Sequence, residues 1–136
     1  MSEMNAAAQK SVPAALRTWF VVHFAADMLF AVPLMLAPQA MLTWFGWQTV
    51  DPIAARLVAA ALFGIGIESY LGRSAGVEAY RGMLNLKIIW SLGAVAGIAA
   101  SIYQGAQGRP PAVWARLAIF AAFNLVWVYW RWRLRD

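Results

Sequence analysis

Long apolar stretches separated by short polar connections dominate this sequence. A helix needs about 20 mostly apolar residues to cross about 30 Å of hydrocarbon, and four stretches meet that requirement. No stretch alternates apolar and polar residues as a barrel strand would. The pattern therefore predicts an all-α integral membrane protein, a single domain over residues 1–136 that folds as an antiparallel bundle of four transmembrane helices. The predicted spans cover about residues 17–37, 52–72, 81–103 and 112–132.

Prolines and glycines mark the ends of the predicted helices. Pro38 stops the first helix, and Pro33, one turn earlier, predicts a kink. Asp51 followed by Pro52 is typical of a helix start, because the carboxylate accepts from free backbone N–H groups and proline fits the first helical position. Gly105 follows the end of the third helix.

The connection Gln39–Val50 is rich in apolar and aromatic residues, among them Trp44 and Trp47. Tryptophan favours the headgroup level of a bilayer, where its ring is half buried. We interpret this connection as a short segment in the outer membrane interface. Residues 1–12 are predicted to be a flexible N-terminus.

The distribution of basic residues predicts the orientation of the bundle. Connections on the cytoplasmic side of a membrane protein are enriched in lysine and arginine. Three arginines lie on one side of the predicted bundle: Arg56, Arg109 and Arg116. Seven basic residues lie on the other side: Lys10, Arg17, Arg73, Arg81, Arg131, Arg133 and Arg135. Both termini are therefore predicted to be cytoplasmic.

The composition agrees with a lipid environment. The chain is 62% hydrophobic and 12% charged, too few polar groups to cover a water-soluble domain of 136 residues. Its net charge of +5 comes from basic residues between and beyond the apolar stretches, which favours anionic lipid headgroups as partners and argues against nucleic acid. With no cysteine, the chain forms no disulfide, thiolate metal site or thiol nucleophile.

Small residues at helical spacing predict helix packing faces, because helices in lipid associate through close backbone approach. They point either to packing within the chain or to a homo-oligomer. The second helix has such a stripe in Leu57, Ala61, Gly64 and Glu68, and the third in Gly93, Gly97 and Ser101.

Polar residues inside the predicted spans are the candidate functional residues, since charged groups in hydrocarbon are costly. Counting from the flanking arginines at about 1.5 Å per residue places one polar residue of each helix roughly 7 to 11 Å inside the cytoplasmic boundary. These four residues are His23, Glu68, Lys87 and Asn124. Because Glu68 and Lys87 lie at matched depth on consecutive antiparallel helices, we predict a salt bridge between them.

Asp27 lies one turn deeper than His23 on the same helical face, and Ser91 lies one turn from Lys87 in the same way. A carboxylate beside an imidazole can share a proton, as in the relays of transporters, or can simply satisfy it within the core. His23, Asp27 and Glu68 could also form a one-histidine, two-carboxylate metal set. Because Lys87 competes for Glu68, we predict neither a metal nor a cofactor.

Aromatic residues flank this layer at similar depth. Tyr70 and Trp90 are predicted as secondary lining of the site together with Ser91, and could contact a flat, apolar or cationic small ligand. Their alternative role is to anchor the helices at the interface.

The stretch 55–67, which reads ARLVAAALFGIGI, resembles the second helix of the small bacterial four-helix membrane proteins of the DoxX-like kind. The resemblance covers one helix of four. It implies a bacterial inner-membrane four-helix bundle and carries over no catalytic or binding residue.

Three functions remain open from the sequence. The first is binding or translocation of a small solute or protons at the layer of His23, Asp27, Glu68, Lys87 and Asn124. The second is a structural or accessory membrane subunit whose polar layer only locks the bundle. The third is a membrane enzyme acting on an apolar substrate, with Asp27 or Glu68 as acid or base.

Overall fold

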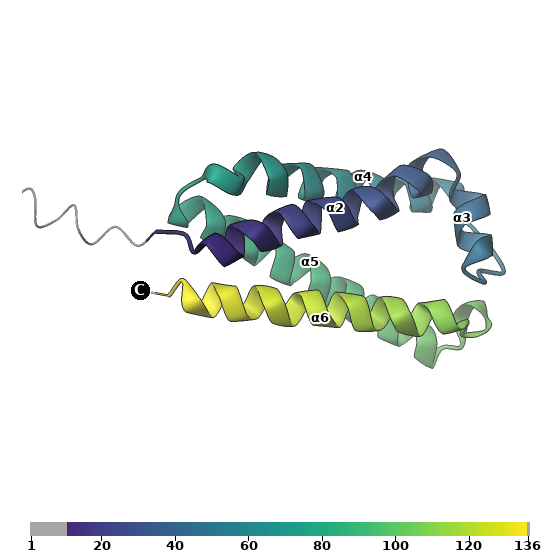
Figure 1. Ribbon diagram of the computed structural model, residues 1–136. Helices are drawn as coiled ribbons and strands as arrows, with labels where there is room; N and C mark the ends of the chain where they lie inside the picture. The colour runs from purple at the N-terminus through teal and green to yellow at the C-terminus, as the bar shows by residue number, and fades with distance from the viewer. Residues whose placement is uncertain (1–10, 136) are drawn as a thin grey trace, which may run out of the picture.

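The computed structural model describes residues 11–135, and this part of the chain is helical with short connections (Figure 1). Four of its helices are long and apolar enough to cross a membrane, which confirms the prediction of an all-α membrane bundle. Most of the segment predicted to be flexible, residues 1–10, lies outside the described residues. The helices are α2 (Ala14–Leu36), α3 (Pro38–Trp44), α4 (Pro52–Leu71), α5 (Val77–Tyr103) and α6 (Pro111–Arg133), with 3-10 turns η1 (Gly72–Ser74) and η2 (Ala106–Gly108).

The predicted boundaries agree with the observed ones to within a few residues. Asp51 caps α4, its Oδ1 accepting from the backbone N–H of Ile53 at 2.9 Å and of Ala54 at 3.1 Å. Pro38 does stop the first helix, but it also occupies the first turn of α3. The first part of the predicted interfacial connection is therefore itself a short helix.

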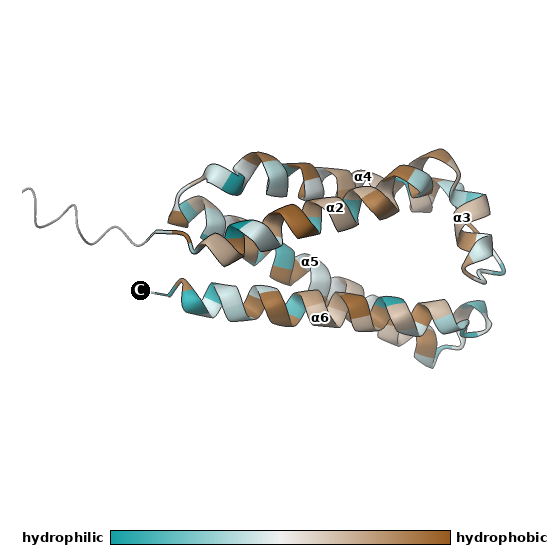
Figure 2. Ribbon diagram, in the orientation of Figure 1, coloured by the Kyte–Doolittle hydropathy of each residue, from teal (hydrophilic) through white to brown (hydrophobic). Residues whose placement is uncertain are grey.

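The four long helices are arranged as two pairs. Figure 1 shows α2 beside α4 and α5 beside α6, and the contacts within these pairs are far more extensive than those between them. We call the end where α2 begins and α6 ends the terminal end, and the opposite end, which carries α3, the α3 end (Figure 1). Hydrophobic residues run along all four long helices (Figure 2), as lipid-facing surfaces require.

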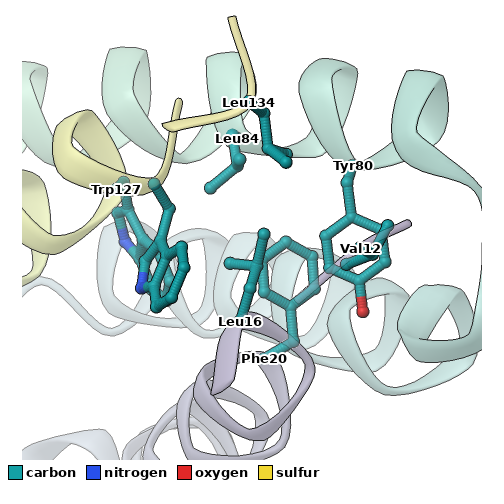
Figure 3. Close-up of a cluster of buried hydrophobic side chains, with 8 residues drawn as sticks. Val12, Leu16, Phe20, Tyr80, Leu84, Trp127 and Leu134 are labelled. Atoms are coloured by element: carbon teal, nitrogen blue, oxygen red, sulfur yellow. The ribbon is translucent and has the colours of Figure 1, made fainter. Parts of the chain in front are cut away.

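A cluster of buried apolar side chains joins the two pairs at the terminal end (Figure 3). Phe20 and Tyr80 pack with their ring centroids 4.5 Å apart and their planes tilted by 31°, and Phe20 meets Trp127 edge to face at 5.9 Å. Val12, the last residue of the segment predicted to be flexible, is buried in this cluster. The buried members are Val12, Leu16, Phe20, Tyr80, Leu84, Trp127, Trp130 and Leu134.

At the α3 end, the connection between α3 and α4 contacts the connection between α5 and α6, and this contact joins the two helix pairs. The side-chain Oε1 of Gln107 accepts from the backbone N–H of Gln48 at 2.8 Å and of Thr49 at 3.0 Å, and its Nε2 donates back to Thr49. Nearby, Gly46 has a φ of 89°, and a Cβ there would lie 2.9 Å from the Pro110 side chain. Glycine therefore permits both the turn and the close approach to Pro110.

The prediction that the two stripes of small residues pack against other helices of the same chain is wrong. A Cβ added at Gly64, Gly93 or Gly97 would meet nothing within 4 Å, and all three residues are exposed. The glycine that does allow close approach is Gly66, which faces Asp27 of α2. The sequence locates small residues, but the rotation of each helix decides which of them pack.

Candidate functional site

A cavity of about 120 Å³ lies among the long helices and contains most of the predicted polar residues in its wall. Its lining comes from α2, α3, α4, α5 and α6, so no helix pair forms it alone. On α6 the lining extends from Trp127 to Arg116, three turns or about 16 Å of helix rise. The polar lining residues are His23, Asp27, Lys87, Ser91 and Arg116.

Lys87 of α5 connects three helices. Its Nζ donates to Ser69 Oγ of α4 at 2.6 Å and lies 3.0 Å from His23 Nδ1 of α2. The side chain is buried, and its Nζ lies 4.9 Å from the ring centroid of Phe20 and 5.2 Å from that of Trp127. A buried ammonium group needs such hydrogen bonds and aromatic faces, because an isolated charge in hydrocarbon is costly.

The nitrogen His23 Nδ1 has two competing neighbours. It lies 3.0 Å from Lys87 Nζ, a hydrogen-bond donor, and 2.9 Å from Asp27 Oδ2, an acceptor. A ring nitrogen of neutral imidazole either carries a proton and donates it, or lacks one and accepts. Nδ1 can therefore serve Lys87 or Asp27, but not both at once.

Asp27 is the buried acidic residue of this cluster. When Nδ1 accepts from Lys87, no other donor among the described residues reaches Asp27 Oδ2, and this buried oxygen is left without a hydrogen-bond partner. Leaving a buried carboxylate oxygen unsatisfied costs on the order of 1–3 kcal/mol or more. The position of one proton on His23 thus decides which charged group of the cluster is satisfied.

Aromatic rings enclose the imidazole on the side of α6. The His23 ring meets Phe123 and Trp127 edge to face, with centroids 5.0 Å away in both cases. Phe123 and Trp127 stack on each other at 5.6 Å. These rings separate the cluster from acyl chains and fix the imidazole plane.

Asn124 and Ser91 join α5 to α6 beside the cluster. Asn124 Nδ2 donates to Ser91 Oγ at 2.9 Å and to the backbone carbonyl of Ile88 at 3.1 Å. Ser91 Oγ donates in turn to the carbonyl of Lys87 at 2.7 Å. Ser91 lines the cavity, whereas Asn124 lies outside the lining and holds Ser91 through its hydrogen bond.

The predicted salt bridge between Glu68 and Lys87 is wrong. Glu68 is exposed, and its Oε1 lies toward Gly72 at the terminal end of α4. Its neighbour Ser69 is the residue that faces Lys87. Within residues 11–135, no three histidine or acidic side chains come together as a metal site, so the set of His23, Asp27 and Glu68 is not assembled.

The two predicted aromatic lining residues differ in their positions. Trp90 lines the cavity. Tyr70 is 39% exposed and lies outside the lining, with its ring 4.9 Å from Phe24 and 3.9 Å from the Arg73 guanidinium. Tyr70 therefore acts as an anchor at the terminal end of the bundle.

Arg116 lines the cavity near the α3 end, although the sequence assigned it to the outer flank. Its guanidinium carbon lies 4.6 Å from the Trp47 ring centroid and 5.0 Å from that of Phe45. Its position about one turn inside the predicted fourth span was the available signal, but counting basic residues for orientation treats every arginine as a flanking residue.

No protein-family model matches the chain, and comparison with curated proteins and with solved structures gives no match. The fold and the cavity therefore carry the functional argument alone, and the resemblance to DoxX-like proteins stays an expectation.

Proposed function

We propose that this integral membrane protein binds or translocates a small solute or protons through the cavity lined by His23, Asp27 and Lys87. The observation that carries the proposal is the competition of Lys87 and Asp27 for His23 Nδ1, at 3.0 and 2.9 Å. Two arrangements of one proton satisfy different charged groups in the cavity wall. A proton or a polar ligand group entering the cavity changes which arrangement is stable.

The location of the cluster supports this role. Ionisable residues inside a membrane span are costly, and they commonly mark ion pathways and proton relays. His23, Asp27 and Lys87 are all buried within the spans and all border the cavity. The excess of basic residues at the terminal end and the DoxX-like stretch favour a bacterial inner membrane with cytoplasmic termini.

Proton flux into proteoliposomes tests the proposal. Vesicles holding the purified protein and a trapped pH-sensitive dye receive an external acid pulse. Wild-type protein should accelerate acidification over protein-free vesicles, and Asp27→Asn should lower the protein-dependent rate about a hundredfold or more, the range of a lost proton-transfer group. Glu68→Gln is the matched control, since Glu68 is exposed and outside the cluster, and should leave the flux unchanged.

Three outcomes would count against the proposal. Wild-type flux equal to that of protein-free vesicles would exclude proton translocation. Asp27→Asn protein with wild-type flux and only a lower melting temperature would favour the structural or accessory role instead. Product formation from an apolar substrate, lost in Asp27→Asn, would favour the enzyme role, for which Asp27 is the remaining buried carboxylate in the cavity.

A further inference from the structure

Arg116 is a second charge inside the bundle, far from the His23 cluster. It follows the start of α6 at Pro111 by five residues, about 7 Å of helix rise, and lies about 16 Å along α6 from Trp127. Both residues line the same cavity. The cavity therefore has a polar cluster near the terminal end and an arginine near the α3 end.

The guanidinium of Arg116 contacts rings but no hydrogen-bond acceptor. Phe45 and Trp47 lie over it at 5.0 and 4.6 Å, and among residues 11–135 no oxygen accepts a hydrogen bond from it. Aromatic faces stabilise the positive charge, yet they leave the in-plane N–H donors of an arginine unmet. An arginine stays protonated under physiological conditions, so these donors remain available to an anion.

The rings over Arg116 are held in place by the connections at the α3 end. Gly46, between Phe45 and Trp47, turns the chain against Pro110. The two residues after Trp47 are hydrogen-bonded to the Gln107 side chain. The arginine is thus positioned by its surroundings, which lowers the entropy cost of binding a ligand there.

The charges that face the cavity do not balance. Among residues 11–135, Asp27 is the only acidic residue in the cavity lining, and it shares the His23 cluster with Lys87. Arg116 adds a positive charge that no carboxylate in the lining offsets. These two cations disfavour a cationic ligand, whereas an anionic group would complement Arg116.

The wall between Arg116 and the His23 cluster is apolar. It contains side chains from α2, α4 and α6, and none of them offers a hydrogen bond to a polar ligand. Such a wall fits a hydrocarbon tail, because it offers the tail only apolar contacts. The residues are Phe30, Leu34, Val58, Leu62, Ile119 and Phe120.

We infer that the cavity binds a single-chain amphiphile with an anionic head, of the fatty-acid class, whose carboxylate pairs with Arg116 and whose tail lies along the apolar wall toward His23. This inference rests on the proposed function, because it names the ligand class of the same cavity. A bilayer phospholipid offers related chemistry from another source, and the test separates the two.

Thermal stabilisation by dodecanoate tests the inference in nanodiscs of zwitterionic phosphatidylcholine. Dodecanoate should raise the melting temperature of the wild-type protein. Arg116→Gln should raise the concentration needed for half-maximal stabilisation about tenfold, the effect of losing one charge-assisted bidentate pair. Arg116→Lys keeps the charge and should raise that concentration by a smaller factor. Arg56→Gln is the matched control, because Arg56 is exposed, bonded to the Met35 carbonyl at 3.1 Å and outside the cavity lining.

Ligand controls assign the contribution of each part. Dodecanol carries the tail without the charge and acetate carries the charge without the tail, so each should stabilise the wild-type protein less than dodecanoate does. Equal dodecanoate response in the wild type and Arg116→Gln, or an equal response to dodecanol, would overturn the inference. Stabilisation by added phosphatidylglycerol but not by dodecanoate would overturn it in favour of a bilayer lipid.

The outcome is separable from that of the proposed function. Dodecanoate binding that depends on Arg116, together with proton flux equal to that of protein-free vesicles, would retain the ligand class and reject proton translocation. Proton flux that depends on Asp27, without a dodecanoate response, would do the reverse. The melting temperature of each variant without ligand shows whether that variant folds. If Arg116→Gln does not fold, the dodecanoate response of Arg116→Lys is compared with that of the wild type instead.

Discussion

Asp27 of α2 packs directly against the bare backbone of Gly66 in α4: a Cβ on Gly66 would lie 2.7 Å from Asp27 Cβ and 3.1 Å from its Oδ2. Gly66 therefore fixes how deeply the carboxylate sits in the cavity wall.

Gly66→Ala should destabilise the protein by about 1–3 kcal/mol, as overpacking of a buried contact does, and should displace Asp27. The measurement is thermal unfolding in nanodiscs. Gly64→Ala is the control on the same helix, because a Cβ there meets nothing within 4 Å, and it should be neutral or slightly stabilising. Equal destabilisation by both variants would contradict the contact.

His23 is the only histidine of the chain, so its ring nitrogens give a single set of NMR signals after histidine-specific ¹⁵N labelling. Asp27→Asn removes the anionic acceptor and should favour the tautomer protonated at Nε2, in which Nδ1 accepts from Lys87. Lys87→Met removes the donor and should favour the proton on Nδ1, facing Asp27. Identical tautomer populations in the two variants would show that the neighbours do not compete.

Ser69→Ala should destabilise the bundle by about 1–3 kcal/mol, because it removes an acceptor of the buried Lys87 ammonium. Ser101→Ala is the matched control. Both serines donate to the carbonyl four residues earlier, at 2.5 Å for Ser69 and 2.9 Å for Ser101, but Ser101 is exposed and accepts from no side chain in the described chain. Its substitution should change the free energy of unfolding by less than about 0.5 kcal/mol. Denaturant titration compares the two.

Gln107→Ala should break the contact between two connections: the one from α3 to α4, which contains Gln48 and Thr49, and the one from α5 to α6, which contains Gln107. Four hydrogen bonds to Gln48 and Thr49 are lost, so the amides of these two residues should exchange with deuterium faster, while the amides of α4 keep their protection. Gln104→Ala should leave exchange unchanged, because Gln104 is exposed and its side chain makes no hydrogen bond to any residue of the described part of the chain. Unaltered protection at residues 48 and 49 in Gln107→Ala would show that the Gln107 side chain does not hold this connection.

The absence of cysteine makes the orientation directly testable. A cysteine at Gln104, near the α3 end, should react with a membrane-impermeant maleimide applied to intact cells. A cysteine at Ser74, at the terminal end, should react only after permeabilisation, because the basic residues predict that this end is cytoplasmic. The opposite labelling pattern would reverse the predicted orientation.

The helices could be predicted from the sequence because the length of an apolar stretch and its bounding prolines determine a span. The same counting gave the depth of each polar residue, but not its direction around the helix axis. Adjacent residues of a helix differ by about 100° in direction. That rotation turns Ser69 toward Lys87 and Glu68 away from it, although both lie at nearly the same depth.

The pairing of His23 with Asp27 could be predicted because it depends only on spacing within one helix, and the two atoms do lie 2.9 Å apart. The approach of Lys87 to the same nitrogen could not, since it depends on how α5 is placed against α2. Arg116 was missed for a related reason: only the fold brings Phe45 and Trp47 over its guanidinium.

The cluster at the terminal end includes both Val12 and Leu134, residues from the two extremes of the described chain. Because a ribosome makes the chain from its N-terminus, α2 is synthesised long before the segment that covers it. Leu16 and Phe20 must therefore face lipid or the insertion machinery on the side that α6 covers until α6 has been synthesised, and this cluster can be completed only after α6 is inserted.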